Sequence, residues 1–286
     1  MLKFVKSAIK RYLFKRWGIR RRIKLDLILS KGYYRELQDL LHIAKVEGVD
    51  LVRIGHEYDG GYIMLNDFHD GGIAYSFGIS NDVSWDKDMA SRGYDVFMYD
   101  HTIDELPEQN PHFHWSKLGI ADGETRDDRL KTIDELIKQN HHEDKRNMIL
   151  KMDVEGAEWG FLSQVDSETL SQFSQITLEF HNVINNRDTK QVLEALRKLN
   201  ITHQLIHVHA NNYKNYYIVL GGKKICPVLE LTYALRSNYS FIEDYDIVLP
   251  LDLDAPNNPL QPEIELGCWN AQVNAGERFS VCVRVL

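Results

Sequence analysis

Acidic residues and a histidine gather after two apolar segments in the middle of the chain. Asp153, Glu155 and Glu158 follow residues 147–152, and Glu179 and His181 stand at the end of residues 175–180. Both segments have the length and composition of buried strands, and alternation along a strand places Glu179 and His181 on one face. Because parallel strands end at one edge of a sheet, we predict that Asp153, Glu179 and His181 converge at an active site.

An imidazole accepts a proton near neutral pH, so His181 is the predicted general base. Asp153 and Glu179 would position the acceptor, and Glu155 is predicted to contact the substrate. The alternative for Glu155 and Glu158 is a role in stabilising the start of a helix, where acidic side chains are favoured by the helix dipole.

A second set of residues suits an adenosine ligand. Residues 73–79 read as a strand that ends in Gly78, and residues 94–99 as a strand that ends at Asp100, which lies 22 residues later. An acidic residue at this separation can accept the two ribose hydroxyls of a nucleoside, although it could instead cap the following turn. The loop has one glycine where a pyrophosphate-binding loop has several, which favours S-adenosylmethionine over a dinucleotide.

Two further segments are candidates for acceptor binding. His209 and Asn211 follow residues 203–208, a predicted strand, and His209 is the second candidate for the base; a polar turn is the alternative. Arg53 and Asp59 belong to a predicted hairpin formed by residues 51–54 and 62–65, and we expect both to contact the acceptor.

The elements around these residues alternate between strand and helix. Strands are predicted at 73–79, 94–99, 112–118, 147–152, 175–180 and 203–208, with helices at 84–92, 127–139, 156–165 and 189–199. This alternation predicts an α/β Rossmann-like fold with a mostly parallel sheet. Residues 216–220 and 228–234 compete for the remaining place in the sheet. Residues 25–47 are predicted to be helical, and 236–286 irregular with a few strands.

Length and composition fit one soluble enzyme domain with extensions. The chain has 286 residues, of which 43% are hydrophobic and 27% charged. No apolar run is long enough to span a membrane, no secretory signal is visible, and the three cysteines form no disulfide or zinc pattern, so a cytoplasmic protein is expected. We divide the chain into a helical extension (1–48), the main domain (49–235), and a C-terminal extension that packs on the core or forms a substrate lid (236–286).

The N-terminus differs sharply in charge from the rest. Residues 1–24 contain ten basic residues and no acidic ones, so the remainder carries −18 while the whole chain carries −8. An acidic body argues against nucleic acid as a partner. Basic and aromatic residues at helical spacing favour peripheral contact with the inner face of a membrane, and packing on the domain or on a second subunit of a homo-oligomer is the alternative.

Four motifs over residues 50–235 resemble methyltransferases: the first given below resembles the signature of the FkbM family, the second the first cofactor motif of a related methyltransferase branch, and the other two are similar to motifs of that group. They are Lys151-Met152-Asp153-Val154-Glu155-Gly156-Ala157-Glu158, Tyr75-Ser76-Phe77-Gly78-Ile79-Ser80-Asn81-Asp82-Val83-Ser84-Trp85-Asp86, Arg53-Ile54-Gly55 with Asp59-Gly60-Gly61-Tyr62, and His207-Val208-His209-Ala210-Asn211-Asn212-Tyr213. The resemblance implies a seven-stranded class I methyltransferase fold, S-adenosylmethionine as donor, and O-methylation, often in glycan, polysaccharide or secondary-metabolite pathways. It also implies positions for the cofactor: Ser76, Gly78 and Asp82 along it, Asp100 at the ribose, Leu118 and Gly119 near the adenine, and Asp153 near the methionine end.

The sequence therefore predicts an S-adenosylmethionine-dependent O-methyltransferase that acts on a sugar or glycan-precursor hydroxyl. No metal site is predicted from ligand spacing, although a divalent cation at Asp153 and Glu179 stays open. One alternative is a nucleotide-sugar glycosyltransferase, because Asp252-Leu253-Asp254 has the form of a metal–diphosphate site. The other is a methyltransferase-like domain that binds a partner without catalysis.

Overall fold

The computed structural model describes residues 31–123, 126–184, 189–214, 216–220, 223–270 and 282–285. The basic segment 1–24 lies outside the described residues, so its predicted membrane or subunit contact stays a prediction. Among the described residues, no helix is long and apolar enough to cross a bilayer.

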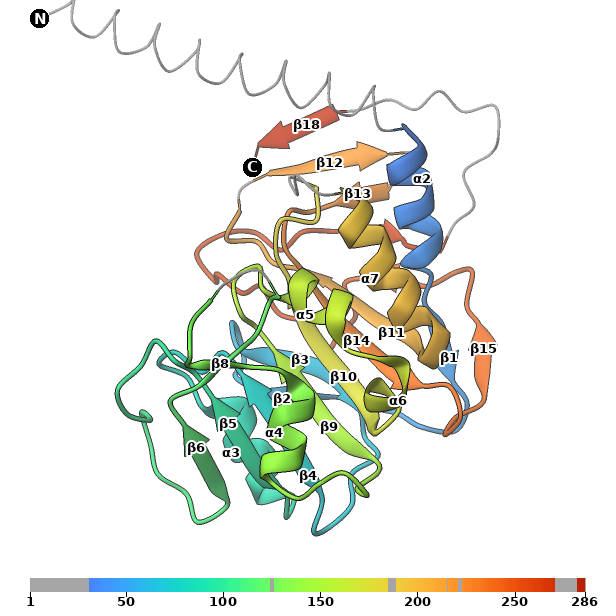
Figure 1. The fold of residues 1–286 in the computed structure, drawn as a ribbon. Helices are drawn as coiled ribbons and strands as arrows, with labels where there is room; N and C mark the ends of the chain where they lie inside the picture. The colour runs from blue at the N-terminus through green and yellow to red at the C-terminus, as the bar shows by residue number, and fades with distance from the viewer. Residues whose placement is uncertain are drawn as a thin grey trace, which may run out of the picture.

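A seven-stranded sheet forms the centre of the molecule (Figure 1). Five neighbouring strands run parallel, and one antiparallel strand lies between the fifth and the last. In order across the sheet the strands are β11 (His203–Ala210), β14 (Leu229–Leu235), β10 (Phe173–Phe180), β9 (Met148–Met152), β4 (Ile73–Phe77), β5 (Asp95–Tyr99) and β6 (Phe113–Ser116). The predicted α/β architecture is confirmed.

Residues 229–235, and not residues 216–220, take the remaining place in the seven-stranded sheet. β14 pairs with both β10 and β11 and is buried along its whole length. β12 (Tyr216–Leu220) instead joins β13 (Lys223–Ile225) and β18 (Cys282–Val285) in a separate three-stranded sheet. Composition does not explain this choice, because β14 contains Glu230 and Thr232 whereas β12 consists only of hydrophobic residues.

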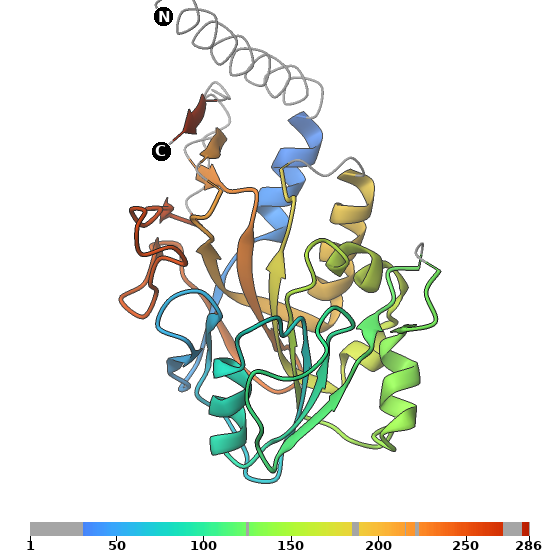
Figure 2. The same ribbon diagram turned by 90° about the vertical axis from the view of Figure 1, so that its left-hand side faces the viewer.

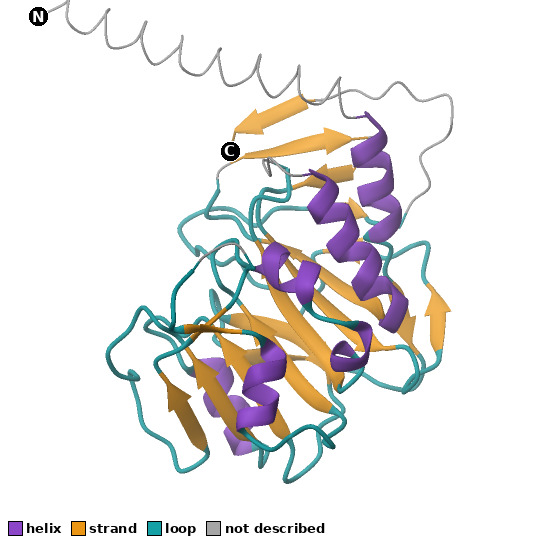
Figure 3. Ribbon diagram, in the orientation of Figure 1, coloured by secondary structure: helices purple, strands orange, loops and turns teal. Residues whose placement is uncertain are grey.

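Helices and a hairpin cover the two faces of the sheet (Figures 2 and 3). On one face a large apolar core joins the strands to α2 (Lys31–Leu40), α4 (Ile133–Gln139), α5 (Glu158–Gln164), α6 (Ser167–Leu170) and α7 (Thr189–Thr202). On the other face, α3 (Ser84–Ser91) and the hairpin of β2 (Leu51–Gly55) and β3 (Gly61–Leu65) enclose a second core. The sheet is therefore buried on both sides and exposes its chemistry at the strand ends.

The predicted hairpin is confirmed, and its tip is set by a glycine. Gly60 has φ +82°, and a Cβ atom there would come within 2.2 Å of Oδ2 of Asp82. The absence of a side chain at Gly60 therefore lets the hairpin approach the loop after β4.

Two helix predictions need correction. The helix expected over 25–47 ends at Leu40 in its described part, and β1 (Ala44–Val46) pairs with β15 (Phe241–Glu243). Propensity did not show this strand because its partner lies near the other end of the chain. The helix expected from residue 127 begins at Ile133, where Thr132 and Glu135 form a capping box, and β8 (Leu130–Lys131) pairs with β7 (Gly119–Ile120) instead.

Residues 246–270 cross the ends of β11 and β14, with β16 (Val248–Leu249) and β17 (Gly267–Cys268) pairing inside this segment. Buried ion pairs fasten it: Nε2 of His207 lies 3.1 Å from Oδ2 of Asp254, and Nε2 of His209 lies 3.2 Å from Oε2 of Glu263. The amide of Asn212 donates to backbone carbonyls of the same segment. These contacts hold residues 246–270 in one position beside the strand ends.

Candidate active site

A cavity of about 840 Å³ opens at the carboxyl ends of the parallel strands. It lies where the strand order reverses, between β4 and β9, which is the usual ligand position in such sheets. The β4–β5 side of the cavity comprises Gly78, Ile79, Ser80, Asn81, Asp82, Tyr99, Asp100, His101, Thr102, Gly119 and Ile120. The β9–β10 side comprises His56, Tyr58, Asp59, Gly60, Tyr62, Asp153, Val154, Glu155, Ala157, Tyr213, Asn257 and Pro259.

Gly78 joins the two sides. Its φ is +79°, and a Cβ atom would come within 1.6 Å of the carbonyl oxygen of Asp153. The backbone carbonyl of Gly78 accepts a hydrogen bond of 2.6 Å from Nζ of Lys151, and the amide of Asp153 donates to Phe77. The glycine is therefore required by the contact between strand ends, a reason that its sequence context did not show.

On the β4–β5 side, Asp100 is fully engaged with backbone and hydroxyl donors. Oδ2 accepts from the amides of Ile79 and Ser80, at 3.0 and 2.9 Å. Oδ1 accepts from the amide and hydroxyl of Thr102. Burial raises the pKa of Asp100, but these hydrogen bonds outweigh it, so its pKa is lowered and the carboxylate stays ionised. Asp100 both shapes the loop after β4 and faces the cavity, and its contact with a ribose stays a prediction.

The other predicted cofactor residues separate into two groups. Gly78, Asp82 and Gly119 line the cavity, and Asp82 also accepts hydrogen bonds from the amide and hydroxyl of Ser84 at the start of α3. Ser76 is completely buried, and neither Ser76 nor Leu118 is among the lining residues. Gly119 and Ile120, which follow Leu118 in the chain, line the cavity in its place.

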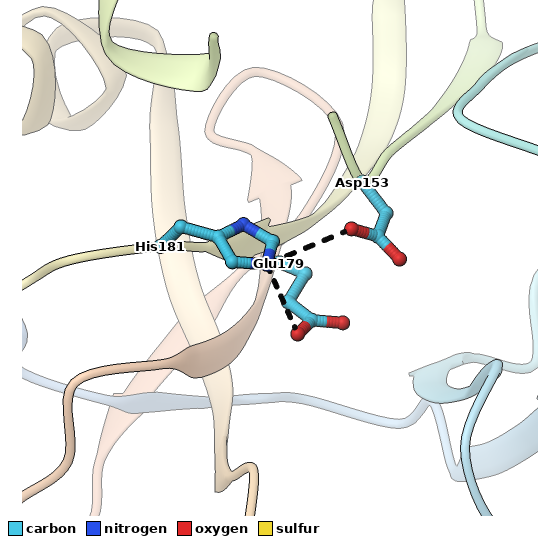
Figure 4. Close-up of side chains that lie close together, drawn as sticks. All are labelled: Asp153, Glu179 and His181. Atoms are coloured by element: carbon cyan, nitrogen blue, oxygen red, sulfur yellow. Dashed lines mark ion pairs between the residues drawn. The ribbon is translucent and has the colours of Figure 1, made fainter. Parts of the chain in front are cut away.

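On the β9–β10 side, Asp153, Glu179 and His181 come together as predicted (Figure 4). Nε2 of His181 lies 3.5 Å from Oε1 of Glu179 and 3.9 Å from Oδ1 of Asp153. Oε2 of the exposed Glu155 is 3.3 Å from the same nitrogen. Asp153 and Glu155 line the cavity, while Glu179 and His181 lie just behind them.

Hydrogen bonds hold these side chains in place. Nδ1 of His181 lies 3.0 Å from Oε1 of Glu158, which also accepts from the amide of Val154. Oε1 of Glu179 accepts from the side-chain amide of Asn211, at 3.0 Å. A histidine oriented by a carboxylate on one nitrogen presents the other nitrogen in a fixed direction, here toward Glu155, Glu179 and Asp153.

The electrostatics assign different protonation states to the group. Burial raises the pKa of Asp153 to about 6, against the charges of Lys151 and His181. Burial and the charge of Asp153 raise the pKa of Glu179 well above its ordinary value. Burial lowers the pKa of His181, but its hydrogen bond to Glu158 and the surrounding carboxylates outweigh burial, so the pKa is raised. Of the three, Asp153 is best suited to accept a proton near neutral pH, and His181 is favoured as an imidazolium.

The same group could hold a divalent cation. One ligand atom of each residue lies within 4.8 Å of the others, and a second such set is Asp59, Glu179 and Glu230. Carboxylate oxygens with one imidazole are ligands that Mg²⁺ and Mn²⁺ accept.

His209, the second candidate for the base, lies between two carboxylates. It is buried within β11, with Nδ1 2.8 Å from Oε2 of Glu230 and Nε2 near Glu263. Burial lowers the pKa of His209, but these two carboxylates raise it to about 10. A histidine with a pKa of about 10 is protonated at neutral pH and is poorly suited to accept a proton, so the structure argues against His209 as the base.

Two predicted acceptor contacts also act indirectly. The guanidinium of Arg53 donates to the carbonyls of His56, Tyr58 and Leu253, and so holds the hairpin tip rather than facing the cavity. Asn211 positions Glu179 and accepts from the amide of Tyr213. Asp59 does line the cavity, where it accepts from the amide of Asn257 at 2.9 Å.

The structure adds residues to which the sequence analysis gave no role in the site. Tyr62 and Asn257 line the cavity, and Glu230 lies behind them on β14. Glu230 could have been noticed as a lone charge in an apolar strand. Nothing in the proline-rich context of Asn257 indicated its position.

Unusual backbone conformations mark the same loops. Ser80, Glu155 and Asn182, which follow β4, β9 and β10, all have positive φ angles between 50° and 59°. Non-glycine residues in this region carry strain, which concentrates at ligand sites.

The fold and the site at the strand ends define an α/β methyltransferase-type domain. Residues 73–214 match the model of the methyltransferase FkbM domain, which contains all of the parallel strands and the Asp153, Glu179 and His181 group. Residues 73–214 are an FkbM methyltransferase domain, as the motifs indicated, and the protein is an S-adenosylmethionine-dependent methyltransferase. No curated protein sequence matches the chain.

Solved methyltransferases resemble the structure only distantly. A TehB-like SAM-dependent methyltransferase from Corynebacterium glutamicum is 10% identical with a TM-score of 0.34, over 59% of this chain and 82% of that one. A mutant of 16S rRNA (adenine(1408)-N(1))-methyltransferase from Catenulisporales acidiphilia is 13% identical with a TM-score of 0.31, over 65% and 97%. Likeness at this distance says nothing about the substrate of this chain.

Proposed function

We propose that this methyltransferase transfers a methyl group from S-adenosylmethionine to a hydroxyl of a sugar or glycan precursor. The observation that carries the proposal is the cavity with two chemically different sides. Its β4–β5 side has an ionised aspartate and a short loop without a phosphate-binding glycine pattern, which suits a nucleoside. Its β9–β10 side has polar lining and a carboxylate with a pKa near neutrality, which suits a hydroxyl acceptor.

The residues on the β4–β5 side would bind the donor. Asp100 would accept from ribose hydroxyls, while Gly119 and Ile120 would lie along the adenine. The bound donor supplies an electrophilic methyl group on a sulfonium. Asp153 extends from the next strand end, so it lies where the two sides meet.

The residues on the β9–β10 side would prepare the acceptor. Asp153 would accept the hydroxyl proton as the new C–O bond forms and the S–CH₃ bond breaks, which leaves a methyl ether and S-adenosylhomocysteine. The imidazolium of His181, held by Glu158, would keep Asp153 ionised and in position. This assigns the base to Asp153 in place of the residue that sequence analysis preferred.

The glycosyltransferase alternative has lost its main support. Oδ2 of Asp254 accepts from the amide of Leu251 and pairs with His207, and this side chain is almost fully buried. It is therefore a fastening residue of the C-terminal segment and not a ligand of an open metal–diphosphate site.

The decisive test is transfer of a labelled methyl group. Purified protein is incubated with ¹⁴C-methyl S-adenosylmethionine and a panel of mono- and oligosaccharides, and base-stable label in the sugar is counted. Label in a methyl ether is the expected result. Binding of S-adenosylhomocysteine without labelling of any sugar, together with labelling of a protein or nucleic acid, would refute the acceptor class.

A further inference from the structure

The β9–β10 side of the cavity carries more negative charge than its own residues neutralise. Asp59, Glu179 and Glu230 have carboxylate oxygens within 4.8 Å of one another. Glu230 is paired with Nδ1 of His209 at 2.8 Å, and Glu179 has only the longer contact of 3.5 Å with Nε2 of His181. The other oxygen of Glu230 accepts from the amide of Asn257, which donates to Asp59 as well.

The nearby basic side chains are committed elsewhere. Arg53 donates to three backbone carbonyls and Lys151 donates to the carbonyl of Gly78. His181 lies near Glu179, but its imidazole also faces Asp153, Glu155 and Glu158. Asp59 and Glu179 therefore have no cation committed to them alone, and without one their burial favours the protonated carboxyl groups.

The hydroxyl group of Tyr62 also indicates a ligand beside these carboxylates. Tyr62 is 2% exposed, lines the cavity, and makes no side-chain hydrogen bond within the described part of the chain. The charges around its ring belong to Asp153, Glu179, Glu230 and Asp59. The hydroxyl group of Tyr62 therefore faces the cavity without a partner from the described residues, so a ligand there can form a hydrogen bond with it.

The free oxygens match the donors of a primary ammonium group. Oδ2 of Asp59 and Oε2 of Glu179 make no hydrogen bond with the described residues, and the hydroxyl oxygen of Tyr62 is a third acceptor. An ammonium group has three N–H donors and one positive charge, and charge-assisted bonds to carboxylates are the strong ones. A divalent ion fits less well here, because both oxygens of Glu230 are already used.

We infer that the acceptor of this methyltransferase carries a primary ammonium group, as an amino sugar does, and that Asp59, Glu179 and Tyr62 bind it. The inference rests on the proposed function, since it describes the acceptor of the same cavity. The ammonium would anchor the acceptor at the hairpin and β10 while a neighbouring hydroxyl faces Asp153. A neutral sugar would leave Asp59 and Glu179 without a cation, and an anionic acceptor would be repelled.

The test compares sugars that differ in one group. D-glucosamine, D-glucose and N-acetyl-D-glucosamine are titrated into the full chain by ligand-observed NMR, with and without saturating S-adenosylhomocysteine. We expect glucosamine to bind about tenfold or more tightly than the two neutral sugars. Asp59→Asn and Tyr62→Phe should reduce that preference, whereas Glu57→Gln, an equal charge change at an exposed position of the same hairpin, should not.

Two outcomes would overturn the inference. One is equal binding of all three sugars to the wild-type chain. The other is Mn²⁺ binding that Asp59→Asn abolishes, without any preference for glucosamine, which would make the cluster a metal site. Failure of S-adenosylhomocysteine to bind would count against the proposed donor instead, because the titrations without it still compare the sugars.

Discussion

The two sides of the cavity use the same residue type in opposite ways. On the β4–β5 side, Asp100 receives four hydrogen bonds and its pKa is lowered. On the β9–β10 side, burial raises the pKa of Asp153, Glu179 and Asp59, and nearby partners partly oppose this for Asp153 and Asp59. Hydrogen bonds within the folded chain are enough to keep Asp100 ionised. The carboxylates on the β9–β10 side need a proton or a bound cation to compensate for their burial.

The two sides also differ in where the chain supplies them. The β4–β5 side is built wholly from residues 78–120, inside the range that matches the family model. The β9–β10 side adds the hairpin tip and Asn257 with Pro259, which lie outside that range. The residues predicted to bind the donor therefore all lie within the range of the family model, whereas part of the predicted acceptor side lies outside it.

The largest effect is expected from Asp153→Asn. The amide cannot accept a proton at neutral pH, so kcat should fall by roughly 10²–10⁴-fold. The affinity for S-adenosylhomocysteine, measured by calorimetry, should change little if the two sides act separately. Asp144→Asn, an exposed aspartate before the other end of β9, is the matched control. A kcat within threefold of wild type would remove Asp153 as the base.

Loss of the ion pair between His209 and Glu230, which holds the C-terminal segment, should lower the stability of the protein. His209→Gln breaks a buried pair and leaves Glu230 without its cation, so the free energy of unfolding at pH 7 should fall by about 3–5 kcal/mol. Urea unfolding followed by circular dichroism measures it, with the exposed His112→Gln as control.

The same histidine predicts a pH dependence of stability. Its folded pKa is raised from 6.5 to about 10, so its contribution is fully present below pH 6.5 and is lost as pH rises toward 10. Wild-type stability should fall across this window more steeply than that of His209→Gln. If the free energy of unfolding has the same pH dependence in both proteins, the ion pair of His209 does not stabilise the C-terminal segment.

On the β4–β5 side, Asp100→Ala should weaken donor binding by about 1–3 kcal/mol, because a charge-assisted contact and the support of the loop are both lost. At saturating donor, kcat should stay within a fewfold of wild type. Calorimetry with S-adenosylhomocysteine checks the affinity, and Asp104→Ala on the exposed neighbouring loop is the control. Unchanged affinity would exclude Asp100 from the donor site.

The smallest effect is the shape of the acidic limb of kcat. If Asp153 is the base, activity is present above pH 6 and is lost as pH falls through about 6, by roughly tenfold per unit below it. If His181 were the base, its raised pKa would place the limb above 6.5. A pH profile at saturating donor separates the two, and His181→Gln should keep the limb in the first case and abolish it in the second.

Local pattern alone determined much of this protein. The strands around Gly78, Asp100 and Asp153, and the convergence of Asp153, Glu179 and His181, follow from apolar runs, alternation and the rule that parallel strands share an edge. These features depend on residues close in sequence, which is why they could be predicted before any contact was known.

Long-range pairing decided the rest. β1 exists because β15 lies beside it, and His209 is an imidazolium because Glu230 and Glu263 approach it from distant parts of the chain. Asn257 reaches Asp59 across 198 residues, and burial raises the pKa of Asp153, which is why we propose Asp153 as the base in place of His181. Protonation depends on which charges surround a group and how much water remains, and both are properties of the folded chain rather than of any segment of it.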